Sequence, residues 1–372
     1  MEKKTLYIVT ELFPPDETST AYILGEMANA ASNEYNVHVI CGPEIYDTRK
    51  KIDNKNPFVL DDRITLTRVR NLSVDKNTKL GKLWSFLVMS LRLYNLAKVR
   101  IKEGDKVLMV TNPAPLVLLM SRLRKMRAFN LNILVHDVFP ENTRSAGIHI
   151  PSFLYKLIKN FFDNAYSRAD KLLALGRDMA CILNQKTRGG VPVDIVENWA
   201  DLDNVKPLPF PDGNVKLEYA GNIGRVQGLE ALLEQVPNDV ELHFYGTGSM
   251  EQALKDKRKS NVFFHGPYFR SQQTSVLGSA HVSVVTLAKG MYGLGVPSKT
   301  YNILAAGRPI LYLGPEEGEI GLLIKEHKVG YIGWPEMWDV EELYSMGNKA
   351  RQVAEQMYSK EVILEKFIKA LR

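Results

Sequence analysis

Cysteine is scarce in this sequence. Its 372 residues include two cysteines, Cys41 and Cys181, which lie far apart in apolar stretches. This number and spacing predict neither a disulfide framework nor a zinc site. They favour a reducing compartment, so we expect a cytoplasmic protein.

Long hydrophobic runs are also missing. No stretch reaches about 18 uninterrupted apolar residues, so the sequence predicts no transmembrane helix. The apolar run near the N-terminus is too short for a signal peptide and is typical of a first strand. If the protein acts at the inner face of the cytoplasmic membrane, we therefore expect it to bind the membrane surface peripherally.

The charge is only mildly unbalanced, with a formal net charge of +6. That value suits phosphorylated small molecules, an anionic membrane surface or nucleic acid, and it does not choose among them. The basic residues are scattered, and no basic stripe is interleaved with aromatic residues, so nucleic-acid binding is not expected. A hydrophobic fraction of 45% and a charged fraction of 24% are ordinary for a globular protein.

Short apolar runs alternate with longer helical patterns along the whole chain. This alternation, with nearly continuous apolar strands, indicates an α/β protein with parallel sheets covered on both faces. The predicted strands are Leu6–Thr10, Val37–Cys41, Thr65–Val69, Lys106–Val110, Asn132–His136, Lys171–Leu175, Lys216–Ala220, Val240–Tyr245, Asn261–His265, Val282–Thr286 and Ile310–Leu313.

The pattern restarts after a segment rich in proline and glycine, residues 207–213, which is typical of an interdomain linker. We predict two doubly wound, Rossmann-like domains, with a boundary between about residues 186 and 213. The predicted domains are residues 1–190 and 191–350, and residues 351–372 form a C-terminal helix. Ligands of such folds bind at the carboxyl ends of the strands, and the cleft between the domains is the default site.

Three glycine-rich turns follow predicted strands of the second half. The first contains Gly221, Asn222, Gly224 and Arg225, and the second contains Gly246 and Gly248. The third precedes Pro297, Ser298 and Lys299, where a helix is expected to open with free N–H groups. Ordinary turns with solvated cations would give the same pattern, but three of them together, two carrying a cation, favour a nucleotide-diphosphate site.

Two loops of the first half carry further polar residues. Thr18, Ser19 and Thr20 follow the first strand, where they could meet a phosphate or sugar or merely cap a helix. His136 follows another strand and could be a polar contact or a general base oriented by Asp137 or Glu141; a structural histidine is the alternative.

Two helix candidates are both apolar and basic. They span Leu83–Ile101 and Phe153–Phe162, and in the second Phe153, Leu157 and Phe161 share one face. Basic amphipathic helices can lie on an anionic membrane. Helices that simply cover the sheet of the first domain are the alternative interpretation.

The chain resembles a retaining glycosyltransferase of the GT-B architecture, in the family called group 1 or family 4. The resemblance covers nearly the whole length and is nearest to the bacterial branch that builds O-antigen and capsular polysaccharide, with N-acetylfucosamine-type transfer. Its motifs are Phe13-Pro-Pro15, His136-Asp137, Pro140-Glu141, Asn198-Trp-Ala-Asp201, Gly221–Gly228, Gly246-Thr-Gly248, Val296–Asn302 and Ala305–Pro309.

The resemblance implies a hexosyl- or N-acetylhexosaminyl-transferase. It would move a sugar from a UDP-sugar donor to a glycan, often one linked to a lipid diphosphate, without a cofactor or metal. His136, Arg225 and Lys299 would be the catalytic residues, with the second domain binding the nucleotide sugar and the first facing the acceptor. The C-terminal helix, residues 351–372, would pack back on the first domain. Contacts to the donor would come from Thr18, Ser19, Gly221, Asn222, Gly246, Gly248, Pro297, Ser298 and Asn302.

The chain departs from the family pattern at several positions. Two glutamates usually bracket the third loop, and here Leu294 and Asn302 stand in their places. Gln227 replaces an expected lysine, and Thr18 and Ser19 replace paired glycines. Asn302 or Glu319 could bond a ribose hydroxyl instead. These departures leave the donor sugar open.

Two other functions fit the same features. A UDP-sugar 2-epimerase shares the two-domain architecture and needs no acceptor. A non-catalytic nucleotide-sugar-binding partner of a polysaccharide assembly complex would account for the missing glutamates. Asp201-Leu-Asp203 has the spelling of a metal-binding motif but lies at the predicted domain junction, so no metal site is expected.

Overall fold

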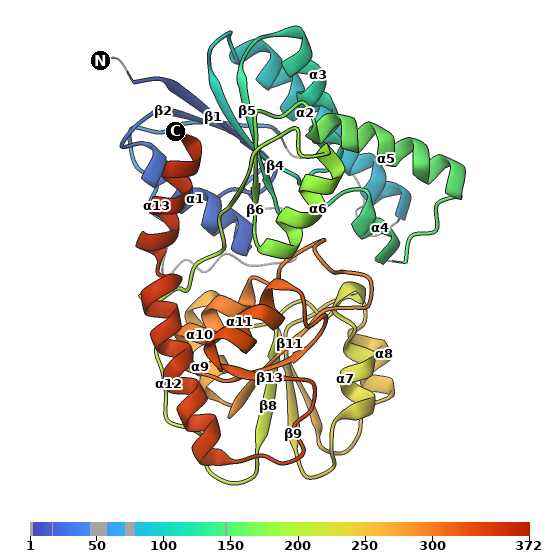
Figure 1. The fold of residues 1–372 in the computed structure, drawn as a ribbon, viewed down its shortest axis with the longest axis vertical. Coiled ribbons are helices and arrows are strands. Elements are labelled where there is room, and N and C mark those ends of the chain that lie inside the picture. The colour runs from blue at the N-terminus through green and yellow to red at the C-terminus, as the bar shows by residue number, and fades with distance from the viewer. Residues whose placement is uncertain (1–2, 17, 45–57, 71–78, 146) are drawn as a thin grey trace. The chain divides into compact units, whose positions relative to one another are not determined.

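The computed structural model describes residues 3–16, 18–44, 58–70, 79–145 and 147–372. The chain divides into two compact units. Unit 1 comprises Met1–Asn142, His149–Val196 and Leu364–Arg372, and unit 2 comprises Thr143–Ile148 and Glu197–Ile363. Each unit contains one sheet flanked by helices (Figure 1).

The sheet of unit 1 has the strand order β3-β2-β1-β4-β5-β6-β7, and every pair of neighbours is parallel. The order reverses beside β1, as in doubly wound folds. The strands are β1 (Thr5–Thr10), β2 (Asn36–Cys41), β3 (Thr65–Arg68), β4 (Lys106–Val110), β5 (Asn130–Val135), β6 (Lys171–Ala174) and β7 (Val193–Ile195).

The sheet of unit 2 repeats this arrangement with the order β10-β9-β8-β11-β12-β13, again with parallel neighbours. Its strands are β8 (Lys216–Ala220), β9 (Glu241–Tyr245), β10 (Val262–Gly266), β11 (Val282–Thr286), β12 (Ile310–Leu313) and β13 (Gly330–Ile332). The eleven predicted strands are confirmed with small shifts at their ends. The sequence missed β7 and β13, which are three-residue edge strands.

Helices connect the strands in both units. The predicted helices at Leu83–Ile101 and Phe153–Phe162 are confirmed as α2 and α5. The helices are α1 (Ser19–Ala31), α2 (Lys79–Arg100), α3 (Pro115–Met126), α4 (Glu141–Ser145), α5 (Ser152–Tyr166), α6 (Arg177–Thr187), α7 (Leu229–Gln235), α8 (Glu251–Asp256), α9 (Gln273–Gly278), α10 (Lys299–Ala305), α11 (Glu319–His327), α12 (Val340–Met357) and α13 (Lys360–Leu371).

The segment 207–213 lies within unit 2 rather than between the units, which corrects its interpretation as a linker. The reason is Arg308, which is almost fully buried and donates from Nη2 to the carbonyl oxygens of Pro209 and Gly278 at 3.0 Å each. Its guanidinium also lies 4.7 Å from the centre of the Phe210 ring. A buried charge must be hydrogen-bonded, so these contacts hold the segment against α9.

The C-terminal stretch forms two helices, α12 and α13, which are separated at Tyr358 and Ser359. Its last residues, Leu364–Arg372, belong to unit 1. There the Lys171 ammonium donates to the carbonyl oxygen of Ala370 at 2.6 Å, and the Tyr35 hydroxyl donates to that of Leu371 at 3.4 Å. The final carbonyl groups of α13 thus receive the cation and the donor that a helix terminus requires.

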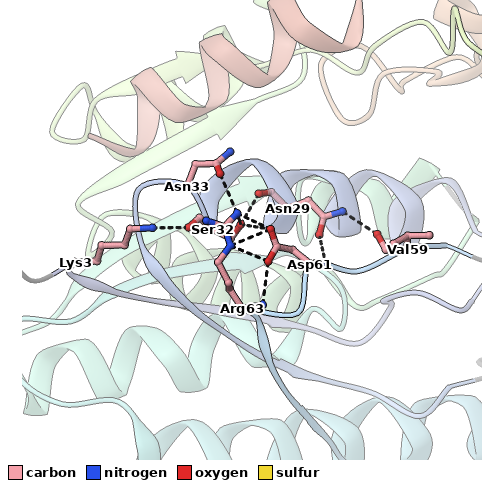
Figure 2. Close-up of polar contacts among 7 residues, drawn as sticks. All are labelled: Lys3, Asn29, Ser32, Asn33, Val59, Asp61 and Arg63. Atoms are coloured by element: carbon pink, nitrogen blue, oxygen red, sulfur yellow. Dashed lines mark hydrogen bonds and ion pairs between the residues drawn. The ribbon is translucent and has the colours of Figure 1, made fainter.

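A polar cluster ties the chain that returns after residue 57 to the end of α1 (Figure 2). Asn29 donates to the carbonyl oxygen of Val59 at 3.0 Å and accepts from the backbone of Asp61 at 2.9 Å. Arg63 donates to Asp61 and to Ser32, and it holds the pKa of the Asp61 carboxyl well below its usual range. The cluster satisfies groups at a helix end, so its role is structural.

Candidate functional site

Two of the glycine-rich turns lie side by side at the carboxyl ends of β8 and β9. The N–H of Gly221 donates to the carbonyl oxygen of Tyr245 at 2.8 Å, and that of Ile223 donates to Thr247 at 2.9 Å. A Cβ atom at Gly246 would lie 1.9 Å from the carbonyl oxygen of Gly221, and Gly246 has a φ of +133°. Gly246 is therefore needed for the close approach of the two backbones.

The same explanation holds for Gly248, where a Cβ atom would lie 2.1 Å from the carbonyl oxygen of Ile223. The Tyr219 hydroxyl then closes the first turn by donating to the carbonyl oxygen of Asn222 at 2.8 Å. The side chain of Asn222 is exposed. The two loops are joined by backbone hydrogen bonds and form a platform of closely packed main chain.

Lys299, the first residue of α10, reaches this platform. Its Nζ lies 3.2 Å from the centre of the Tyr219 ring and would be 3.8 Å from a Cβ atom on Gly221. Nζ is buried and has no hydrogen-bond partner. A buried ammonium without an acceptor is costly, because cation–π contact replaces only part of its hydration.

Glu218, next to Tyr219 on β8, was not singled out by the sequence analysis. Its side chain is fully buried, and neither carboxylate oxygen has a hydrogen-bond partner. Burial raises the pKa of Glu218, and the positive charges of Lys299 and Arg308 oppose that rise. Burial likewise lowers the pKa of Lys299, and the charge of Glu218 opposes that fall. The charge on each group therefore favours the charged form of the other, although the two make no direct hydrogen bond.

Arg225 opens the short turn of 3-10 helix that leads to Gly228 and α7. Its side chain is exposed and makes no hydrogen bond or ion pair with any residue that the structure describes. The structure thus places the buried Lys299 at the start of α10 and the exposed Arg225 on the loop that follows β8. An anionic ligand could meet both of them.

The remaining donor-site candidates of unit 2 lie around α10 and α11. Pro297 and Ser298 are half-buried immediately before α10, and Ser298 makes no side-chain capping bond. Glu319 is buried at the start of α11. Leu294 is buried as well, so an apolar side chain occupies the position where the resemblance led us to expect a glutamate.

Asn302 is already engaged within unit 2. Its Oδ1 accepts from the N–H of Asp201 at 2.9 Å, and its Nδ2 donates to Gln273 at 3.1 Å. Asp201 in turn pairs with Arg270 at 2.7 Å, so the first aspartate of the Asp-x-Asp motif takes part in an ion pair. Asn302 holds the Asn-Trp-Ala-Asp segment in this structure, and a ribose contact would require at least one of its bonds to exchange.

His136 lies in unit 1 at the carboxyl end of β5. Its N–H is bonded to the Thr111 hydroxyl at 3.1 Å, and its Nδ1 is 3.4 Å from the Thr20 hydroxyl. Nε2 is buried and has no partner. Burial lowers the pKa of His136 to about 4, so the ring is neutral at pH 7 and can offer Nε2 to a ligand.

The other candidates of unit 1 have structural contacts. Thr18 caps α1 by accepting from the N–H of Ala21 at 3.3 Å, and Ser19 is exposed in the first turn. Glu141 binds the buried Lys186 at 2.7 Å, so its charge is balanced by that lysine. Burial raises the pKa of Asp137 to about 6, which an Asn142 hydrogen bond partly opposes.

Metal ligands and membrane spans were also sought among the described residues. No group of three or more His, Cys, Asp and Glu side chains there could hold a metal ion. None of the helices in that part of the chain is long and apolar enough to span a bilayer.

Comparison with known sequences finds relatives along the full chain. The chain is 29% identical over 401 residues to "Probable glycosyltransferase WbjE" of Pseudomonas aeruginosa, covering 99% of this chain and 97% of that one. It is 25% identical over 250 residues to WcaI of Escherichia coli, which is named as a colanic acid biosynthesis glycosyl transferase; that match covers 58% of this chain and 60% of WcaI. No protein-family model matches the chain.

Solved structures resemble the chain throughout its length. Sucrose-phosphate synthase of Thermosynechococcus elongatus superimposes with a TM-score of 0.74 at 12% identity, covering 99% of this chain and 98% of that one. The fold is that of the GT-B glycosyltransferases. Anabaena Alr3699/HepE, solved in complex with UDP, gives a TM-score of 0.66 at 13% identity, covering 99% of both chains. The predicted GT-B fold class is thus confirmed.

Proposed function

We propose that this GT-B protein is a retaining glycosyltransferase that moves a sugar from a UDP-sugar to a glycan acceptor in bacterial surface polysaccharide synthesis. The observation that carries the proposal is Lys299, whose buried ammonium lacks an acceptor beside two glycine loops. Homology to a glycosyltransferase and to a colanic acid biosynthesis protein supports the transfer reaction, and a UDP-bound neighbour supports the nucleotide.

The proposed chemistry depends on stabilising the leaving diphosphate. Negative charge grows on the diphosphate as the bond to the sugar breaks, and cations fixed in a low-dielectric site stabilise that charge strongly. Lys299 supplies a buried point charge, and Arg225 supplies a fork that matches two phosphate oxygens. We propose that these two cations neutralise the diphosphate without a divalent metal.

Retention follows if the acceptor hydroxyl attacks from the face that the diphosphate leaves. In this proposal the departing phosphate oxygen receives the proton of the acceptor hydroxyl, so no carboxylate nucleophile is needed. We propose that neutral His136 offers its unpartnered Nε2 as a contact for the transferred sugar. Leu294 is an apolar residue at the position where the resemblance predicts a glutamate. We therefore propose a donor sugar that carries an apolar group, rather than a hydroxyl, at that contact.

The transfer reaction is tested directly with EDTA present. UDP-glucose, UDP-galactose and N-acetylated UDP-sugars are incubated with a lipid-diphosphate-linked sugar, and the anomeric configuration of the product is read by NMR. A product with the donor's anomeric configuration is expected. Conversion of a UDP-sugar without acceptor would instead indicate a 2-epimerase. Nucleotide binding with no conversion of any donor would indicate a non-catalytic partner.

We also propose that unit 1 contacts the membrane that carries a lipid-linked acceptor. Helix α3 packs between α2 and α5, and the sequences of these three helices contain a single acidic residue, Asp163, which pairs with Lys159. Exposed apolar side chains accompany the exposed Lys156 on α5. They are Phe153, Leu154, Leu157 and Phe161. An exposed apolar stripe with basic neighbours suits an anionic interface.

Removing this stripe is expected to weaken membrane binding. The double change Phe153→Ser and Leu157→Ser should lower partitioning onto vesicles containing anionic phosphatidylglycerol by about tenfold or more, since each buried apolar side chain contributes on the order of 1.5 kcal/mol. Co-sedimentation at low salt measures this. Met337→Ser is the matched control, because Met337 is 74% exposed on unit 2 and Phe153 is 76% exposed. Equal binding by the double variant and the wild type, or no binding by the wild type, would contradict the membrane contact.

A further inference from the structure

A buried carboxylate stands beside the proposed diphosphate site without hydrogen-bond partners. Glu218 lies on β8 between Leu217 and Tyr219, and both of its oxygens are shielded from solvent. Ser283 of β11 is its partner in the parallel register. Unpaired buried carboxylates are costly, so the position requires an explanation beyond packing.

The charged groups near Glu218 differ in whether hydrogen bonds to other residues already engage them. Arg308 is already engaged, because its guanidinium donates to three backbone carbonyl groups. Tyr219 and Tyr268 add no positive charge, and the negative charge of Glu218 raises the pKa of both hydroxyls further after burial has raised it. Lys299 is not engaged in this way, since its ammonium bonds to no acceptor and lies over the Tyr219 ring.

We propose that Glu218 is the counter-anion of Lys299 inside unit 2. When a diphosphate binds to the Lys299 ammonium, Glu218 takes up a proton from solvent and becomes neutral. The inference rests on the proposed function of this site. Without ligand, one negative and one positive charge balance inside unit 2. A diphosphate brings a second anion to the same ammonium, and the repulsion between that anion and the carboxylate is strong in a low dielectric. The carboxylate becomes neutral when one proton from solvent forms an O–H bond with it, and no other covalent bond forms or breaks.

The proposal predicts proton uptake when UDP binds. Calorimetric titration at pH 8 in HEPES and in Tris, two buffers with different heats of ionisation and no phosphate, counts the protons that are taken up. Phosphate groups of the nucleotide, with a second pKa near about 6, are already ionised at that pH. Wild-type protein should take up a substantial fraction of one proton per UDP. Absence of proton uptake in protein that binds UDP would overturn the proposal.

Two variants assign the proton to Glu218. Lys299→Arg keeps a permanent cation, so uptake should persist. In the double variant Lys299→Arg with Glu218→Gln, proton uptake should be abolished. Its Kd for UDP should stay within about tenfold of the Kd of Lys299→Arg, since the arginine needs no carboxylate to stay charged. Glu241→Gln, on the neighbouring strand β9, should leave uptake unchanged. Persistent uptake in the double variant, or loss of UDP binding by a double variant that keeps the wild-type circular dichroism, would contradict the proposal.

The two proposals fail in different ways. Protein that binds no UDP at all would refute the proposed function and leave no proton to count. Protein that binds UDP, with equal heats in both buffers, would preserve the proposed function and refute the role of Glu218. The wild-type titration alone makes this distinction, so the test does not depend on any variant being folded.

Discussion

Lys299→Met is expected to reduce the kcat/KM of sugar transfer by at least about 10³-fold, because it removes the buried cation that meets the leaving diphosphate. The buried position strengthens the effect, since little water can replace the ammonium. UDP binding should weaken as well, because the diphosphate remains charged after the sugar has left. Steady-state transfer assays and UDP titrations measure the two losses separately.

The same substitution should not unfold the protein. Methionine has a similar length, it fits over the Tyr219 ring, and it removes an ammonium that bonds to no acceptor. It also leaves the buried Glu218 without its counter-charge, so we expect a folded protein whose Tm is lower than that of the wild type, read by thermal circular dichroism. Lys289→Met, at an exposed position of unit 2, serves as the control and should keep full activity. Full activity in Lys299→Met would show that the diphosphate does not bind at this lysine.

Arg225→Ala is expected to lower kcat by about 10²- to 10³-fold, the loss typical of a single group that stabilises transition-state charge. Arg225 is exposed and makes no polar contact with the described residues, so the free energy of unfolding should change by less than about 0.5 kcal/mol. Transfer assays and urea unfolding curves check the two expectations.

The shape of the cation should matter at this position. Arg225→Lys keeps the charge but loses the two-pronged donor, so its activity should lie between that of the wild type and Arg225→Ala. Arg258→Ala, at another exposed arginine of unit 2, should remain fully active. If Arg225→Ala and Arg258→Ala had the same activity, Arg225 would be an ordinary surface residue.

The sequence predicted the fold because its strands are nearly continuous apolar runs. β11 is buried at every position and was predicted with its observed ends. β7 and β13 escaped prediction because three residues are too few for a pattern to emerge. The proline-rich segment 207–213 was misread because proline and glycine mark irregular backbone without indicating whether a distant arginine will bind it.

The site was only partly predictable for a related reason. The sequence indicated Lys299 and Arg225 from glycine turns, but the contacts of Gly246 and Gly248 arise from two loops meeting across adjacent strands, which no local pattern reveals. Asp137 or Glu141 was predicted to orient His136, and the partner that Glu141 has in the structure, Lys186, lies 45 residues away. Thr20, which lies beside His136, comes from 116 residues away.

Glu218 is the residue that the sequence could have indicated. A single carboxylate inside the apolar run Lys216–Ala220 breaks the pattern of a fully buried strand, and such breaks mark functional positions. The run was used only to predict a strand, so the carboxylate attracted no notice. Its relation to Lys299 becomes visible only when β8 and α10 are placed in one unit.

Calorimetric titration with UDP, GDP and CMP in the presence of EDTA tests the central claim most directly. The site proposed around Lys299 and Arg225 predicts that UDP binds without metal and that GDP and CMP bind at least about tenfold more weakly. A preference for GDP would contradict the UDP-sugar donor while leaving a transferase. No binding of any nucleotide would contradict the claim that this is a nucleotide-sugar site.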